Sequence, residues 1–178
     1  MKIVELILDP TDEQSGIEAI SVVETPAIEE NFIALNKHEV LLKEVDKEKR
    51  ILMGAALVPN KQIYRRNEKT DEDYYIFFSE DTVRKASELY FQKSNHQNAT
   101  LEHSEKLKGT TIVESWIVEN SKTDKSALYG MDLPKGTWMV SMKIEDDALY
   151  EKAKTGEVKG FSIEGYFADK YEMSQQKE

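Results

Sequence analysis

A serine and a glutamate lie two residues apart in the stretch GFSIEGYF, residues 160–167. Because side chains alternate sides along a strand, Ser162 and Glu164 fall on one face, and Phe161 and Ile163 fall on the other. A hydroxyl that a rigid strand holds away from the buried side can act as a nucleophile when a neighbouring base takes its proton. The pattern makes Ser162 a candidate catalytic nucleophile, but an ordinary solvated serine on the polar face of a strand is the commoner cause of such a pattern.

The chain has three histidines, and His103 is the only one inside a predicted strand, the segment ATLEHS at 99–104. His38 and His96 fall in polar segments, and no two histidines have the spacing of metal ligands. An imidazole titrates near neutrality and can accept a proton and then return it. His103 is therefore the candidate general base, and the alternative is a half-buried structural histidine with a hydrogen-bond partner.

A third group must hold the imidazole in the correct tautomer. The segment TTIVESWIVE at 110–119 carries Glu114 within an apolar series, where a carboxylate needs a partner because an unpaired buried charge is costly. We expect this segment to return as a hairpin strand beside His103, which makes Glu114 the candidate acid. Glu164 and Asp169 are competing acids.

Composition excludes several classes of function. The 178 residues include no cysteine, which excludes disulfides, thiol nucleophiles and zinc–thiolate sites. The net charge of −10 argues against nucleic acid as a partner, because phosphate binding needs a basic surface. No apolar run approaches the roughly 20 residues that span a bilayer, and the start is too short and too acidic for a signal peptide. We therefore expect an intracellular protein without membrane contact.

Short β-like segments dominate the chain. Apolar and β-branched runs predict strands at 2–8, 17–23, 32–35, 50–59, 61–66, 74–79, 99–104, 110–119, 136–144 and 159–167. Ser79, followed by two acids, predicts a helix at 80–93, and a second helix at 145–156 ends at Gly156. The charged residues 37–50 fit either a short helix or an exposed connection.

These segments predict one domain over residues 1–170 and a polar tail at 171–178. Strands and helices do not alternate regularly, which argues against a parallel doubly wound sheet. An α+β fold that is mostly β fits best, with an antiparallel sheet closed into a β-barrel and a few helices packed outside it. The chain has no P-loop, GxGxxG, HExxH or GxSxG motif, and we expect no cofactor and no metal.

Three segments are distinctive in combination: the histidine strand in TLEHSEKLKGTTIVESWIV, the strand GTWMVSMKI and the serine strand in GEVKGFSIEGYF, which occur in this order. Taken together, they resemble the XkdF-like serine protease domain of phage prohead maturation proteases. The early stretch ISVVETPAIEENF also resembles the segment that opens such chains. The resemblance covers most of residues 17–167.

The resemblance implies an assemblin-like fold, shared with herpesvirus maturation proteases, in which helices surround a β-barrel. It places the catalytic serine at Ser162 and the catalytic histidine at His103. The herpesvirus enzymes use a second histidine as the third member, and neither His96 nor His38 matches that position. An acid is expected there in the phage branch, and we assign it to Glu114.

The implied activity is a serine endopeptidase that cleaves scaffold and major capsid proteins, and also itself, during capsid maturation. Such enzymes act in the host cytoplasm, inside the immature capsid, and the herpesvirus relatives suggest a homo-oligomer. The alternative is a non-catalytic assembly protein that binds scaffold through the same barrel.

Overall fold

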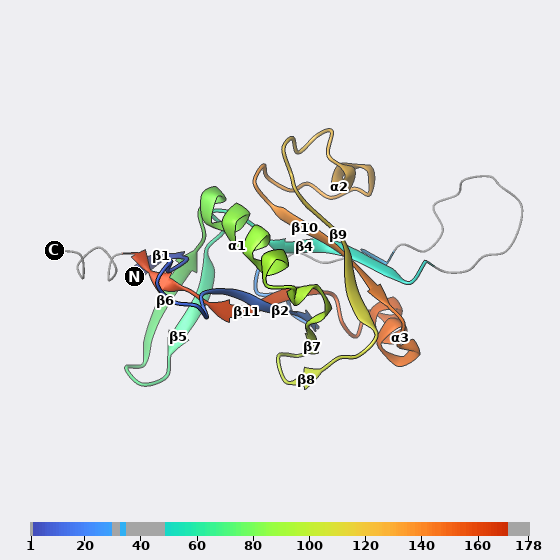
Figure 1. The fold of residues 1–178 in the computed structure, drawn as a ribbon, viewed down its shortest axis with the longest axis horizontal. Coiled ribbons are helices and arrows are strands. Elements are labelled where there is room, and N and C mark those ends of the chain that lie inside the picture. The colour runs from blue at the N-terminus through green and yellow to red at the C-terminus, as the bar shows by residue number, and fades with distance from the viewer. Residues whose placement is uncertain (1, 30–32, 35–48, 171–178) are drawn as a thin grey trace, which may run out of the picture.

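The structure is a computed structural model that describes residues 2–29, 33–34 and 49–170. Within this part of the chain it contains three four-stranded sheets and three α-helices (Figure 1). The prediction for residues 37–48 and the polar tail at 171–178 lie outside the described residues. The mostly-β class predicted from the sequence is confirmed.

The first sheet holds both ends of the described chain together. Its order is β12 (Ala168–Asp169), β1 (Lys2–Ile7), β6 (Glu72–Phe77) and β5 (Ile63–Asn67). The first strand runs parallel to β6 and antiparallel to β12, so the amino-terminal strand lies between two segments that are distant in the sequence.

The second sheet contains the most deeply buried strands. Its order is β3 (Ile33–Ala34), β4 (Ile51–Leu57), β10 (Trp138–Ile144) and β9 (Thr110–Ile117). Every residue of β4 from Leu52 to Leu57 is buried, as the continuous apolar run predicts. All pairings in this sheet are antiparallel.

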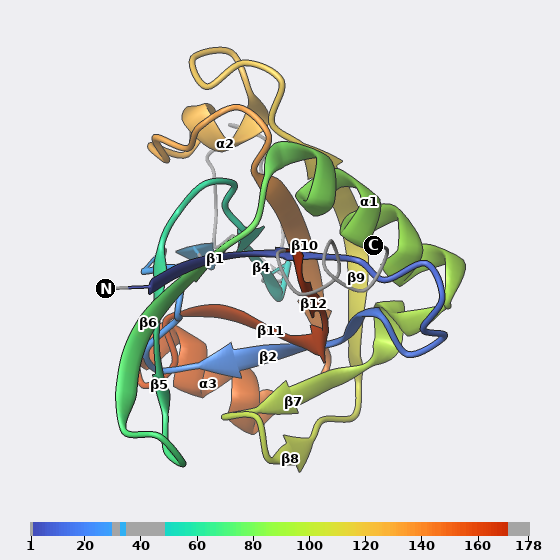
Figure 2. The same cartoon turned by 90° about the vertical axis from the view of Figure 1, so that its left-hand side faces the viewer.

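The third sheet carries the serine and histidine segments. Its order is β11 (Gly160–Tyr166), β2 (Gly16–Val23), β7 (Ala99–Leu101) and β8 (Glu105–Lys106). Strand β2 pairs antiparallel with β11 and parallel with β7. Figure 2 shows this sheet with β2 between β11 and β7.

The predicted hairpin between residues 99–104 and 110–119 is wrong. Strand β7 stops at Leu101 and pairs with β2 and β8, whereas β9 belongs to the second sheet. The chain leaves the strand at Glu102 and His103, whose φ angles of 49° and 58° are left-handed and cannot continue a β-strand. The histidine therefore lies in a turn and not in a strand.

Both predicted helices are present, the first one residue shorter than predicted and the second beginning two residues later than predicted. Helix α1 (Glu80–Gln92) starts after Ser79, whose hydroxyl accepts a hydrogen bond from the amide of Thr82. Helix α3 (Asp147–Thr155) ends at Gly156 in the left-handed conformation. Helix α1 contacts β2 and β10, and α3 contacts β10. The short helices α2 (Lys125–Leu128) and η1 (Asn95–Gln97) were not predicted from the sequence.

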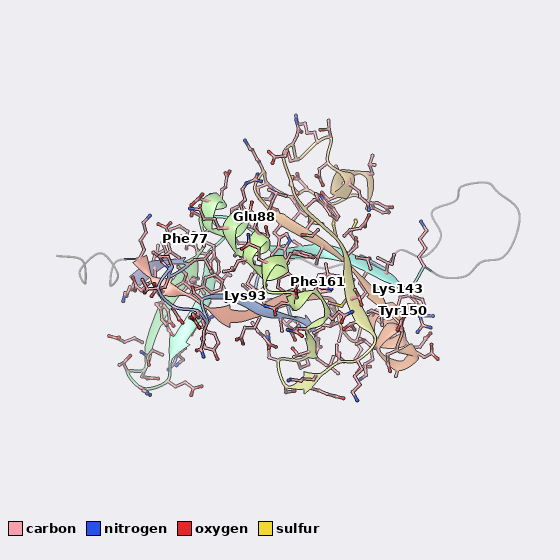
Figure 3. All side chains as sticks on the ribbon, viewed as in Figure 1. Phe77, Glu88, Lys93, Lys143, Tyr150 and Phe161 are labelled. Atoms are coloured by element: carbon pink, nitrogen blue, oxygen red, sulfur yellow. The ribbon has the colours of Figure 1, made fainter. Side chains whose placement is uncertain are left out.

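One apolar core lies between the sheets and α1. Trp138 of β10, Tyr90 of α1 and Phe161 of β11 are among its largest members, and each is at most 1% exposed. Figure 3 shows Phe161 in the interior of the molecule. The strands of the described residues form three separate hydrogen-bonded sheets and no closed barrel. No helix in the described ranges has the length and hydropathy needed to cross a membrane.

Candidate active site

Ser162 lies in the middle of β11, directly opposite Ser21 of β2. The side chains of Ser162 and Glu164 point to the same side of the sheet, together with Ser21 and with Thr100, which pairs with Ser21 on the opposite edge of β2. We call this surface, defined by Ser21, Thr100, Ser162 and Glu164, the serine face. Ser162 is 9% exposed, and its hydroxyl forms no hydrogen bond with any residue that the structure describes.

His103 reaches the serine face from the turn that follows β7. Its Nδ1 atom lies 3.0 Å from Oε1 of Glu164. The imidazole side chain is 44% exposed and the Glu164 side chain 29% exposed, so solvent reaches both partners. The hydroxyl of Thr100 donates a hydrogen bond to the same Oε1 atom. Two donors from β7 and its turn therefore converge on one carboxylate oxygen of β11.

This arrangement has the chemical features of a nucleophile, a base and an orienting acid. A carboxylate that accepts a hydrogen bond from Nδ1 fixes the tautomer in which Nε2 is free to accept a proton. Residues two apart in a strand lie about 7 Å from each other along one face. The carboxylate that contacts the imidazole therefore lies about 7 Å from Ser162 along this face.

The hydrogen bond from Ser162 to His103 is not formed among the described residues. Catalytic hydrogen bonds are often long or absent before substrate binds, and they shorten in the substrate complex. The structure thus brings both predicted residues to one face of one sheet, where Glu164 contacts the histidine.

Glu114 does not contact His103, because β9 and the histidine turn belong to different sheets. Both carboxylate oxygens of Glu114 lie 2.7 Å from Nζ of Lys125, and the hydroxyl of Ser141 donates to Oε2 at 2.6 Å. The hydrogen bonds from Lys125 and then from Ser141 lower the pKa of Glu114. The predicted pairing is corrected: the carboxylate beside the imidazole belongs to Glu164, one of the two competing acids.

The remaining candidates lie apart from this group. Asp169 is on β12 and forms an ion pair with Lys2 at 3.7 Å. His96 stacks on the ring of Phe91, with 6.2 Å between ring centroids. His38 lies outside the described residues. Within the described ranges, no group of three or more histidine, aspartate or glutamate side chains is placed to hold a metal ion.

Strand β11 borders two cavities. The larger, of about 900 Å³, is lined by both apolar and charged residues of β1, β5 and β6, together with Ser162, Ile163 and Gly165 of β11. A smaller cavity of about 610 Å³ is lined by Thr100 and Glu164 of the serine face. The residue proposed as nucleophile thus borders a space large enough for a substrate side chain.

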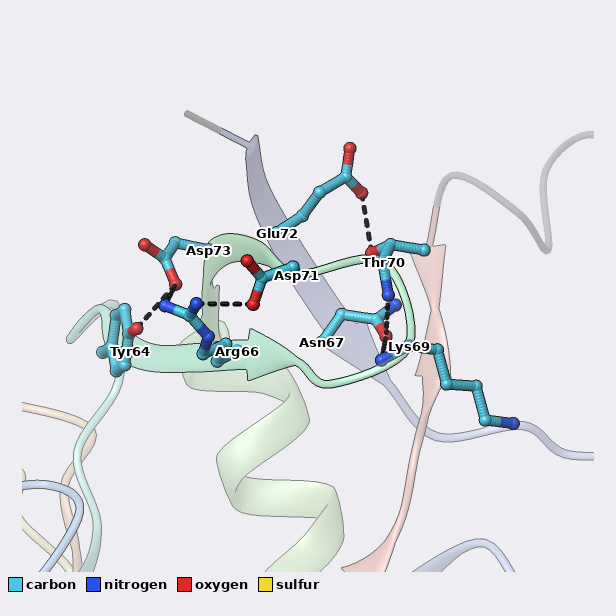
Figure 4. Close-up of polar contacts among 8 residues, drawn as sticks. All are labelled: Tyr64, Arg66, Asn67, Lys69, Thr70, Asp71, Glu72 and Asp73. Carbon is cyan, nitrogen blue, oxygen red and sulfur yellow. Dashed lines mark hydrogen bonds and ion pairs between the residues drawn. The ribbon is translucent and has the colours of Figure 1, made fainter.

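The β5–β6 hairpin forms one wall of the larger cavity. Polar contacts fix its turn: the guanidinium of Arg66 bonds Asp71 and Asp73, and the amide of Asn67 accepts from backbone N–H groups of the turn (Figure 4). Two residues of this network, Asn67 and Asp73, also line the cavity.

Sequence reasoning missed two polar residues of the site, Ser21 and Thr100. Ser21 is fully buried and stands among apolar neighbours in IEAISVV, just as Ser162 stands between Phe161 and Ile163. A lone hydroxyl in an apolar strand was therefore an available signal at both positions. The pairing of β2 with β11 and β7, which brings these residues together, depends on contacts between segments far apart in the chain.

Residues 37–172 match the protein family described as putative phage serine protease XkdF. The matched segment includes His103, Ser162 and Glu164, and it begins after β2. No curated protein and no solved structure matches the chain.

Proposed function

We propose, from the premise that the chain belongs to the family of putative phage serine proteases named XkdF, that it is a serine endopeptidase. Ser162 is the nucleophile, His103 the general base and Glu164 the acid that orients the imidazole. One observation carries this assignment: the 3.0 Å contact between Nδ1 of His103 and Oε1 of Glu164, on the face that also holds Ser162.

The proposed reaction is acyl transfer. Nε2 of His103 takes the proton of the Ser162 hydroxyl while Oγ attacks the carbonyl carbon of the scissile peptide. The imidazolium then returns this proton to the leaving amine, and an ester on Ser162 remains. A water molecule, deprotonated by the same imidazole, hydrolyses the ester and restores the hydroxyl. Glu164 stabilises the imidazolium in both steps through its hydrogen bond with Nδ1.

The family resemblance suggests what such an enzyme cleaves and where it acts. We propose scaffold and major capsid proteins as substrates, with cleavage of the chain itself and formation of a homo-oligomer, inside the immature phage capsid in the host cytoplasm. The same resemblance leads us to propose that the three sheets pack as an assemblin-like barrel, which an experimental structure would test.

The primary test is labelling of the purified protein with a serine-directed fluorophosphonate. We expect labelling at Ser162, located by peptide mass spectrometry, because an activated hydroxyl attacks the phosphorus as it would a carbonyl. Ser162→Ala should abolish labelling and also the cleavage of co-expressed scaffold, since loss of a nucleophile lowers turnover by about 10⁶. His103→Ala should suppress labelling, whereas His96→Ala, which removes a histidine outside the site, should not.

A second candidate function is suggested by the low exposure of Ser162 and by its lack of a hydrogen bond to a base among the described residues. It is a non-catalytic assembly protein that binds scaffold through the same sheets. A folded wild-type protein that binds scaffold, but is neither labelled at Ser162 nor able to cleave it, would support this function and reject the protease.

A further inference from the structure

Ser21 is the residue on which the histidine turn rests. It is fully buried at the centre of β2, and its Oγ accepts a hydrogen bond of 3.0 Å from the backbone N–H of His103. The same hydroxyl donates to the carbonyl oxygen of Thr100 at 3.3 Å. One side chain therefore bonds the backbone on both sides of Leu101, where β7 ends and the turn begins.

The turn needs such support because its backbone is in an unfavourable conformation. Glu102 and His103 are consecutive non-glycine residues with left-handed φ angles. Such residues are strained and persist only where surrounding contacts fix them. The contacts here come from β2: besides the Ser21 bond, the amide of Glu102 donates to the carbonyl of Val22, and the amide of Glu24 donates to Oε1 of Glu102.

The position of the turn determines where the imidazole lies. The His103 side chain bonds Glu164 on β11, and its backbone bonds Ser21 on β2, the strand next to β11. Ser21 is also the residue opposite Ser162. Ser162 and His103, which must exchange a proton in the proposed mechanism, are therefore both held by Ser21. Ser162 is held by backbone pairing of the strands, and His103 is held by a hydrogen bond to the Ser21 side chain.

We propose that Ser21 is a positioning residue of the active site, whose hydroxyl fixes the position of the His103 turn relative to Ser162. This inference rests on the proposed function. It assigns a role to a residue that lies before the segment matched by the family, residues 37–172. It predicts that loss of the Ser21 hydroxyl slows the chemical step without removing any group that touches substrate.

The test compares the rate of fluorophosphonate labelling in Ser21→Ala with that of the wild type. A displacement of about 1 Å in a catalytic group can cost about 10²-fold in rate, so we expect labelling to slow by about 10- to 100-fold. With a scaffold-derived peptide substrate, kcat should fall and KM should stay within about twofold. Ser21→Cys, which fills the same space with a weaker hydrogen-bonding group, should be slow as well.

The matched control is Ser126→Ala. Ser126 is 1% exposed and its hydroxyl bonds Asp124, so the substitution removes a buried serine hydroxyl of the same kind away from the serine face. We expect both alanine variants to lower the melting temperature, but only Ser21→Ala to slow labelling. Labelling of folded Ser21→Ala within twofold of the wild-type rate would overturn the proposal, and recovery of the full rate by Ser21→Cys would assign the effect to packing alone.

A second readout separates this inference from the proposed function. The amide proton of His103 should exchange with solvent at least about tenfold faster in Ser21→Ala than in the wild type or in Ser126→Ala, because its acceptor is lost. This measurement needs no enzymatic activity. If the wild type is not labelled at all, the protease assignment fails, and unchanged exchange at His103 would independently show that Ser21 does not hold the turn.

Discussion

Glu114 and Glu164 have opposite environments at the scale of single residues. The carboxylate of Glu114 is already bonded to a lysine ammonium and a serine hydroxyl, so it has little capacity left to orient an imidazole. Glu164 accepts from Thr100 and from His103, and its second oxygen has no protein hydrogen bond among the described residues. In the proposed mechanism the orienting acid is therefore Glu164, whereas Glu114 joins β9 to Lys125 of α2 and Ser141 of β10.

We predict that Glu164→Gln lowers the labelling rate of Ser162 by about 10²-fold or more, because a neutral amide cannot stabilise an imidazolium and favours the wrong tautomer. Glu114→Gln should leave the labelling rate within about twofold of the wild type. Second-order labelling rates for both variants, measured at equal protein concentration, check this. The assignment of the acid would reverse if Glu114→Gln lost labelling and Glu164→Gln kept it.

We predict that Glu114→Gln instead changes how the free energy of unfolding depends on pH. Hydrogen bonds from Lys125 and Ser141 lower the pKa of Glu114 below its ordinary value of 4.5. A lowered pKa in the folded state stabilises the protein above the ordinary value and loses that effect as the pH falls through the folded value. At pH 7 the free energy of unfolding of the variant should be lower than that of the wild type. The difference should be less than about 1 kcal/mol, because the Glu114–Lys125 pair is partly exposed. Thermal or chemical denaturation in acid should show no difference between the two.

Ser162 and His103, two of the three residues in the proposed mechanism, were singled out from the sequence, and the reason is local. Ser162 and His103 are each unusual within their own segment, so their chemistry is visible without the fold. The choice of Glu114 over Glu164 failed because it assumed a hairpin, and two left-handed residues at 102 and 103 end β7 before such a hairpin can form. Ser21 was missed because its role exists only when three distant strands pair.

At the scale of elements, the main feature of the site is the close approach of β11 to β2 at the carboxyl-terminal end of β11. The register shifts between Glu164 and Gly165. A Cβ atom at Gly165 would lie 2.1 Å from the carbonyl oxygen of Gly16 and 2.8 Å from Cα of Ile17, both backbone atoms that cannot move independently. The glycine therefore permits the close contact that follows directly after the serine face.

We predict that Gly165→Ala pushes β11 away from β2 and displaces Ser162 and Glu164 from the histidine turn. The cost of overpacking is about 1–3 kcal/mol of unfolding free energy, and we expect the labelling rate to fall as well. Gly130→Ala is the comparison: Gly130 has a φ of 79° and no neighbour within 4 Å, so this variant should lose about 1 kcal/mol and keep its labelling rate. Chemical denaturation and fluorophosphonate labelling of both variants test this prediction. Equal labelling rates for Gly165→Ala and Gly130→Ala would contradict it.

The elements that the sequence predicted correctly are those with strong local signals. Apolar runs located β1, β2, β4, β9, β10 and β11, and capping residues located α1 and α3. The two-residue strands β8 and β12 have no apolar run, because their pairing with β7 and β1 is determined by tertiary contacts. Helix α2 was missed although Asp124 caps its first turn, since it has only four residues and lies in a polar loop.

At the scale of the whole molecule, each of the two amino-terminal strands lies in the interior of one of the sheets. Strand β1 lies between β12 and β6, and β2 lies between β11 and β7. Ile17, Ile20, Val22 and Val23 of β2 are each at most 2% exposed. Burial of such a side chain contributes about 1.5–3 kcal/mol, so these four together are comparable to the whole stability of a typical domain, about 5–15 kcal/mol.

The family-matched segment starts at residue 37, after both of these strands. We therefore predict that a chain beginning at residue 37 does not fold cooperatively and is not labelled at Ser162, because β11 and β7 lose their shared neighbour and the histidine turn loses Ser21. A chain ending at residue 170 retains every described strand and should keep both properties. Circular dichroism during thermal unfolding and fluorophosphonate labelling test the two chains side by side. Cooperative unfolding and labelling of the chain that begins at residue 37 would show that the amino-terminal strands are accessory, and the placement of the histidine turn would then have to come from β8 and β11 alone.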